Sequence, residues 1–218
     1  MKVFSSWSGG KDCALATYKA LSQGYEVARL LNMISEDGKR SRSHGILTGV
    51  LDLQSRAIGI PIIHVRSSWE DYEENFKKAM RELKKEGIEG GVFGDIDLEE
   101  HREWIERVCG ELGIKPIMPL WKIELGKLLN EFLELGFKAR VIATPLDENL
   151  LGRELNQAFV AEILKFDSHP CGENGEYHTF VTDGPLFKKR LKVKEVKKEK
   201  RNKAWFLEIS VELGEKGG

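Results

Sequence analysis

Short apolar runs alternate with helically spaced apolar residues through the first two-thirds of the chain. Runs at residues 2–7, 25–33, 61–65, 91–96, 115–118 and 138–144 predict six strands. Between them, apolar side chains recur every three or four residues, which predicts helices near 14–21, 47–58, 69–83, 101–112 and 125–135. This alternation predicts an α/β fold, a doubly wound and mostly parallel sheet covered by helices.

The last third follows a different pattern. A helix is predicted at 155–163, then a polar stretch with two glycines at 172–181. Two runs of alternating charged and apolar residues, from 188 onward and at 204–213, flank a polar turn at 200–203 and predict an antiparallel hairpin. We therefore expect one domain at 1–147 and a small C-terminal α+β domain at 148–218. The lysines of the hairpin are either a solvated edge or a docking surface.

The turn after the first strand carries a candidate anion site. Its residues are Ser8, Gly9, Gly10, Lys11 and Asp12, directly before a predicted helix. The first amides of a helix lack internal partners, and the helix dipole adds positive charge there. A hydroxyl, two glycines and a lysine at that point predict a phosphate site, and a glycine-rich turn without a ligand is the alternative.

The same five residues are not a Walker A loop, which needs Ser or Thr directly after the lysine. They resemble the pyrophosphate loop of the PP-loop ATP pyrophosphatases, in which the aspartate is followed by Ser or Thr. Cys13 stands at that position here, either as a phosphate contact, as a reactive thiol or as a small packed residue.

Composition narrows the function classes. The chain has 218 residues, 41% hydrophobic and 32% charged, with a formal net charge of −1, which argues against a stable nucleic-acid partner. No apolar run approaches the ~18 residues of a membrane span, and no secretory signal is evident. The three cysteines form no metal-binding or redox spacing, so we expect reduced thiols and a cytoplasmic protein without a membrane partner.

A second motif lies at residues 169–180, where carboxylates, imidazoles, a phenol and an amide are concentrated. Its candidate side chains are Glu173, Asn174, Glu176, Tyr177 and His178. Loops this rich in chemical groups are commonly sites, although a polar turn with hydrogen-bonded histidines is the alternative. His44, after the second strand, is either near the same site or a surface histidine.

Four motifs in this order resemble the diphthine–ammonia ligase family, in its short archaeal form. They are Ser8–Asp12, Gly94-Asp95-Ile96, Leu151-Gly152-Arg153 and Gly172–Thr179, and the resemblance covers nearly the whole chain. It implies an adenine nucleotide alpha hydrolase-like (HUP/Rossmann-like) fold. It also implies ATP-dependent amidation of diphthine on translation elongation factor 2, using ammonium and releasing AMP and pyrophosphate through an acyl-adenylate.

The resemblance also suggests roles for residues. Ser8, Gly9, Gly10, Lys11, Asp12, Cys13 and Asp95 would hold ATP, with Lys11 and Asp12 also catalytic. Asp12 and Asp95 would hold Mg²⁺, although Asp95 could instead cap a helix. Glu173, Glu176 and His178 would be catalytic near diphthine. Arg153, Asn174 and Tyr177 would bind substrate, with a surface salt bridge as the alternative for Arg153.

Two other functions fit the phosphate loop. One is a PP-loop enzyme that modifies tRNA, although its sulfur-transferring members use paired cysteines that this spacing lacks. The other is a non-catalytic adenine-nucleotide sensor, which would bind ATP without releasing pyrophosphate. The sequence leaves a homodimer open.

Overall fold

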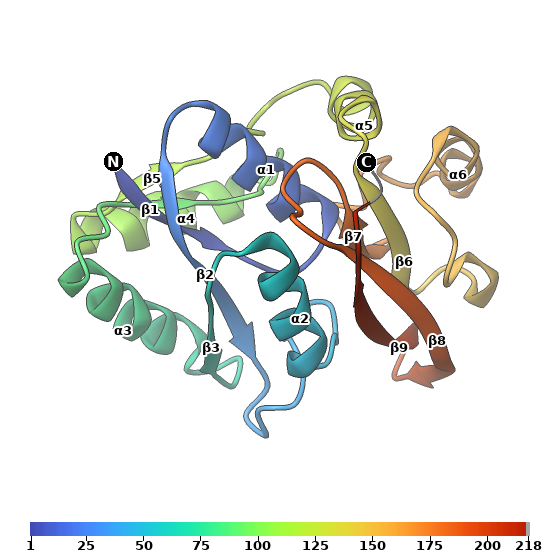
Figure 1. Ribbon diagram of the computed structural model, residues 1–218, viewed down its shortest axis with the longest axis horizontal. Coiled ribbons are helices and arrows are strands. Elements are labelled where there is room, and N and C mark those ends of the chain that lie inside the picture. Colours follow the sequence, from blue (N-terminus) through green and yellow to red (C-terminus); the bar gives the residue numbers. More distant parts are fainter. Residues whose placement is uncertain (217–218) are drawn as a thin grey trace.

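Residues 1–216 are described by a computed structural model, which contains two sheets (Figure 1). The first sheet consists of β1 (Lys2–Ser6), β2 (Glu26–Ile34), β3 (Ile62–Arg66), β4 (Gly90–Val92) and β5 (Lys115–Ile117). Its order is β3-β2-β1-β4-β5 and all its neighbouring strands are parallel. The predicted doubly wound parallel sheet is confirmed. The strand order reverses between β1 and β4, where ligands bind in such sheets.

Helices cover both faces of this sheet (Figure 1). They are α1 (Lys11–Ser22), α2 (Thr48–Ile58), α3 (Tyr72–Lys85), α4 (Glu99–Leu112) and α5 (Leu125–Glu134). Strand residues alternate between the faces: Phe4 packs with Phe76 of α3, whereas Val3 belongs to the core that contains α1 and α2. Because both faces of the central strand β1 are covered, Val3, Phe4 and Ser5 are fully buried.

The second sheet is antiparallel and lies beyond α1 and α2 (Figure 1). It contains β6 (Lys138–Thr144), β7 (His178–Asp183), β8 (Arg190–Arg201) and β9 (Ala204–Gly214), in the order β7-β6-β9-β8. Between β6 and β7 lie α6 (Gln157–Ile163) and the short 3₁₀ helices η1 (Glu148–Leu150) and η2 (Leu164–Phe166). The predicted hairpin is present as β8 and β9, and the lysine-rich β8 is an edge strand.

One expected strand belongs to the other sheet. We expected residues 138–144 to form the sixth strand of the parallel sheet, and this was wrong, because β6 pairs antiparallel with β7 and β9. The sheets therefore change between β5 and β6, ahead of residue 147, and the division into domains at 147/148 stays a prediction. Residues 217 and 218 of the expected second domain lie outside the described residues.

The two sheets share one hydrophobic core. It runs from Val3 and Leu30 of the first sheet through Ala14 and Leu51 to Val141 of the second. A continuous core holds the C-terminal elements firmly against the first sheet, since apolar burial is the main favourable term in folding. Within residues 1–216, no helix is long and apolar enough to cross a membrane.

Candidate functional site

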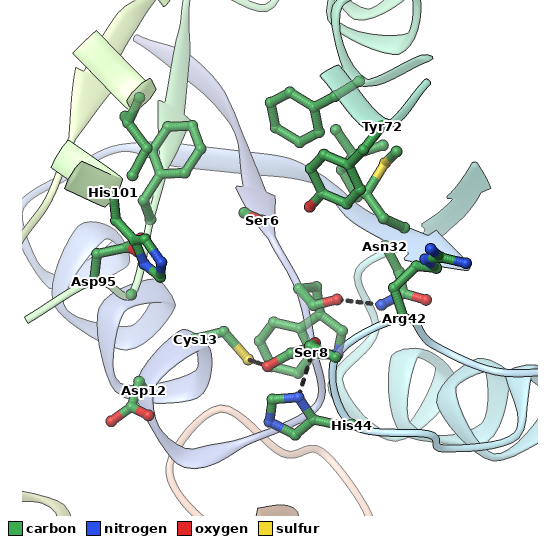
Figure 2. Close-up of a pocket in the computed structure, with 18 of the residues that line it drawn as sticks. Ser6, Ser8, Asp12, Cys13, Asn32, Arg42, His44, Tyr72, Asp95 and His101 are labelled. Atoms are coloured by element: carbon green, nitrogen blue, oxygen red, sulfur yellow. Dashed lines mark hydrogen bonds and ion pairs between the residues drawn. The ribbon is translucent and has the colours of Figure 1, made fainter. Parts of the chain in front are cut away.

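A cavity of about 480 Å³ opens at the carboxyl ends of β1 and β4 (Figure 2). Its polar wall includes Ser8, Asp12, Cys13, Asn32, Arg42, His44, Asp95, His101 and Glu173. Its apolar wall includes Leu31, Met33, Trp69, Tyr72, Phe76, Phe93 and Trp104. The volume lies within the range of small-molecule sites, and the place is the switch point expected for this kind of sheet.

Two glycines shape the turn between β1 and α1. Gly9 has a φ of +87°, a conformation that favours glycine. Gly10 is the N-cap of α1, and no side chain caps the helix. A Cβ at Gly10 would lie 2.8 Å from Nε2 of His44, so this position has no space for a side chain. The anion site that the sequence predicts at this helix start lies beside the cavity and stays a prediction.

The second sheet holds this turn in place. The amide of Val181 donates to the carbonyl of Gly9 at 2.9 Å, and the amide of Lys11 donates to Oγ1 of Thr179 at 3.0 Å. Gln54 of α2 donates to the carbonyls of Gly9 (3.1 Å) and Val181 (2.7 Å). The β1–α1 turn, the predicted phosphate loop, is thus held by contacts from α2 and β7.

Lys11 lies behind the loop and does not line the cavity. Its ammonium is buried, pairs with Asp12 at 2.7 Å and donates to the carbonyl of Cys171. The ring centroid of Tyr177 lies 5.3 Å from Nζ. Burial alone would lower the pKa of Lys11, but the Asp12 carboxylate raises it above the ordinary value, so the ammonium stays charged.

Cys13 is a packed thiol rather than a thiolate. Its Sγ accepts a hydrogen bond from Oγ of Ser8 at 3.4 Å and donates to the carbonyl of Gly10 at 3.1 Å. Burial raises its pKa. All three cysteines are free and buried, in agreement with the expectation of reduced thiols.

Three potential metal ligands meet beside the cavity. One ligand atom each from Asp95, His101 and Glu173 lies within 4.8 Å of the others. Nδ1 of His101 lies 3.0 Å from Oδ1 of Asp95. Burial, with Asp12 and Asp95 nearby, raises the pKa of Glu173 to about 7. Asp95 does not cap α4, whose N-cap is Leu98 without a side-chain hydrogen bond.

The loop at 169–178 is organised by Glu176. Its carboxylate accepts from the amides of His169 (2.9 Å) and Asn174 (3.1 Å). Tyr177 is buried, and its hydroxyl donates to the carbonyl of Pro170 at 2.6 Å. Of the side chains predicted in this loop, only Glu173 lines the cavity, where its Oε1 accepts from the amide of Ile96 at 3.1 Å.

His178 meets His44, which the sequence left as either a near-site or a surface residue. Their ring centroids are 4.5 Å apart, and His44 lines the cavity (Figure 2). Arg153, by contrast, is not among the cavity-lining residues and forms an ion pair with Glu162 at 2.8 Å. The structure therefore agrees with the surface salt bridge that was its alternative.

Sequence reasoning missed part of the cavity wall. The aromatic stripe of the helix predicted near 69–83 was expected to be core. Phe76 is buried in the core and Tyr72 packs against it, but both also line the cavity with Trp69, which is 69% exposed. The guanidinium of Arg42 lies 4.3 Å from the centroid of the Trp69 ring, and its Nε is buried without a hydrogen-bond partner. The one available signal was position, because these residues closely follow the carboxyl ends of β2 and β3.

Comparisons with known proteins cover both halves of the chain. A family model described as the diphthamide synthase N-terminal domain matches residues 1–116, and one described as the diphthamide synthase C-terminal domain matches residues 124–213. A solved structure of a predicted subunit of tRNA methyltransferase from Methanocaldococcus jannaschii has a TM-score of 0.47 and 15% identity, covering 85% of this chain and 98% of that one.

Several relatives have the same name, diphthine–ammonia ligase. The protein from Schizosaccharomyces pombe is 32% identical over 236 residues, which is 96% of this chain and 39% of that protein. The proteins from Rattus norvegicus and Homo sapiens are each 28% identical; each alignment covers 88% of this chain, with 83% of the rat and 82% of the human protein.

Proposed function

The chain belongs to the diphthamide synthase family, and from this premise we propose that it amidates diphthine on translation elongation factor 2. The name of its relatives describes a ligase that forms a C–N bond. The reactants would be the diphthine carboxylate, ammonium and ATP, and the products diphthamide, AMP and pyrophosphate. The match of both family models across one continuous cavity-bearing fold is the observation that carries this proposal.

The reaction needs ATP because a carboxylate has no leaving group that ammonia can displace. Attack of a carboxylate oxygen on the α-phosphorus forms an O–P bond and breaks the bond to the β-phosphate, which releases pyrophosphate. Ammonia then attacks the acyl carbon, AMP leaves, and the nitrogen loses a proton. Ammonium must first lose a proton to become this nucleophile.

The phosphate end of ATP would lie at the start of α1. Ser8 supplies a hydroxyl at the cavity, whereas Gly9 and Gly10 are buried beside it and shape the turn. Lys11 contributes positive charge from behind the loop and fixes the orientation of Asp12. Cys13 supplies a packed surface next to Ser8 rather than a phosphate ligand. The apolar wall around Tyr72 and Phe76 would take the adenine.

A divalent cation fits the carboxylates of this cavity. Asp12 and Asp95 both line it and would hold Mg²⁺, which binds through few carboxylates together with substrate phosphates. Glu173 and His101 lie next to Asp95 as further oxygen and nitrogen donors. Bound there, the ion would offset the negative charge of the phosphates.

Glu173 is the carboxylate of the second motif that would face diphthine, because it alone of the two glutamates lines the cavity. It would either bind the trimethylammonium group or deprotonate ammonium. Glu176, Asn174 and Tyr177 would support this end of the site by holding the loop, and Arg153 by bracing α6.

The decisive experiment supplies diphthine-bearing elongation factor 2, ATP, Mg²⁺ and ammonium to the purified protein. We expect AMP and pyrophosphate in step with amidation of the factor, measured by mass spectrometry. Formation of ADP would contradict the proposal. So would AMP release that depends on neither the elongation factor nor ammonium.

A matched pair of variants tests the loop. Lys11→Ala should lower turnover at least about a hundredfold, since it removes the partner of Asp12 and a charge behind the phosphates. Lys19→Ala, on the same helix, removes only a partner of Glu131 and should retain turnover. A nucleotide sensor would behave differently: Lys11→Ala would weaken ATP binding without any turnover to lose.

A further inference from the structure

Two histidines far apart in the sequence form a pair on the phosphate loop. His44 comes from the segment between β2 and α2, and His178 begins β7. Their ring centroids lie 4.5 Å apart with the ring planes inclined by 43°. Nε2 of His44 is the atom nearest to the position that a Cβ on Gly10 would occupy, at 2.8 Å. The pair therefore borders the N-cap of α1.

The surroundings of the pair keep both rings neutral. Burial, the neighbouring His178 and the Lys11 ammonium hold the pKa of His44 well below its usual value. Burial and Lys11 lower the pKa of His178 to about 4, against a small opposing effect of Glu176. The hydroxyl of Ser43 lies 2.9 Å from Nδ1 of His44 and is uncharged. Nearby Arg40 is paired with Glu208.

We propose that His44 binds the phosphates of the nucleotide and that the pair of His44 and His178 takes up a proton when the anion arrives. Each ring offers an N–H that can donate to a phosphate oxygen, and a protonated ring donates from both nitrogens. This inference rests on the proposed function, because it requires a nucleotide at the start of α1. It adds His44, which neither the motifs nor the family resemblance singled out.

The electrostatic reason is that the ligand changes the charge next to the two rings from positive to negative. Without ligand, a charged imidazole would face Lys11 and a second imidazole, and like charges disfavour one another at this range. A phosphate chain brings several negative charges next to both rings. An opposite charge within about 4–6 Å raises a pKa by roughly 1–3 units, so the pKa of His178 would rise from about 4 to between about 5 and 7.

The test measures protons directly. Binding of an ATP analogue with a methylene bridge between the α and β phosphorus is followed by calorimetry near pH 7, in buffers of different ionisation enthalpy. We expect the wild-type chain to take up more protons than His44→Gln, with a difference of up to about half a proton per site at this pH. Subtracting the proton uptake of His44→Gln from that of the wild type cancels the protons that the ligand itself takes up.

Two further readouts separate the possible outcomes. Affinity of the wild-type chain should fall by up to about tenfold per pH unit between about pH 5 and pH 7, and less steeply in His44→Gln. Ring signals of His44 and His178 in NMR spectra should move towards the protonated form on binding. His64→Gln, on β3, is the control variant and should keep the wild-type proton uptake.

Equal proton uptake in wild-type and His44→Gln chains, together with unmoved ring signals, would overturn this inference while leaving nucleotide binding intact. Failure of the analogue to bind at all would instead reject the proposed function, and this inference with it. His178→Gln is a further variant and should likewise take up fewer protons than the wild type. If it fails to fold, the His44→Gln comparison and the NMR signals still test the proton uptake.

Discussion

Gly94 shows how one absent methyl group shapes the site. It follows β4, and a Cβ built on it would lie 2.8 Å from the carbonyl carbon of Asp12 and from the amide nitrogen of Cys13. Backbone atoms at that distance cannot move aside like the end of a flexible side chain. The first turn of α1 can therefore approach β4 only because residue 94 is glycine.

We expect Gly94→Ala to lower the free energy of unfolding by about 1–3 kcal/mol and to weaken nucleotide binding, because the added methyl group displaces the start of α1. Urea unfolding and calorimetric titration with ATP measure the two effects. Gly110→Ala in α4 is the control, since nothing lies within 4 Å of its Cβ position, and it should be neutral or slightly stabilising. Equal behaviour of the two variants would contradict the close approach.

At the scale of elements, Gln54 ties α2 to both sheets. Besides its bonds to Gly9 and Val181, its Oε1 accepts from Nε1 of Trp7 at 2.9 Å, and the side chain is fully buried. A buried group left without its partner costs more than an ordinary hydrogen bond contributes. The three elements around the phosphate loop therefore depend on one amide side chain.

Gln54→Leu should lower the free energy of unfolding by about 2–3 kcal/mol, because it leaves two carbonyls and an indole N–H without this partner. Hydrogen exchange at the Val181 amide should also accelerate, since β7 loosens from the loop. The matched control is Gln157→Leu, whose amide bonds to Asn130 at the surface. A Gln54→Leu chain as stable as this control would show that the hydrogen bonds of Gln54 do not stabilise the fold.

The elements themselves were largely predictable, whereas their partners were not. Apolar spacing is local, so β1 and α1 could be assigned and the open helix start anticipated. Residues 138–144 are equally apolar in either sheet, and pairing depends on β7 and β9, which are distant in sequence. Two contacts of the candidate site also join residues that are distant in sequence. Lys11 donates to the carbonyl of Cys171, and the ring of His44 lies against that of His178. No short stretch of sequence contains such contacts.

For the whole molecule, His178 links folding to pH. Its pKa is about 4 when folded and near 6.5 when unfolded, so the unfolded chain binds a proton first as the pH falls. Stability from this residue is complete above about pH 6.5 and is lost as the pH falls towards 4. The loss of unfolding free energy over this pH range is about 3 kcal/mol.

Urea unfolding at pH 7.5 and pH 5 measures this effect. The wild-type chain should lose more stability between the two values than His178→Gln, which cannot take up a proton there. The same slope in both chains would show that another group is responsible.

The hydrogen bonds from Thr179 and Val181 to the β1–α1 turn have a consequence for biosynthesis. A ribosome makes the turn well before the strand that holds it, because 168 residues separate Lys11 from Thr179. Prematurely terminated products that stop before β7 would contain the Ser8–Asp12 motif but lack the strand that holds the turn in place. The turn of a nascent polypeptide therefore gains these hydrogen bonds only after β7 has been translated.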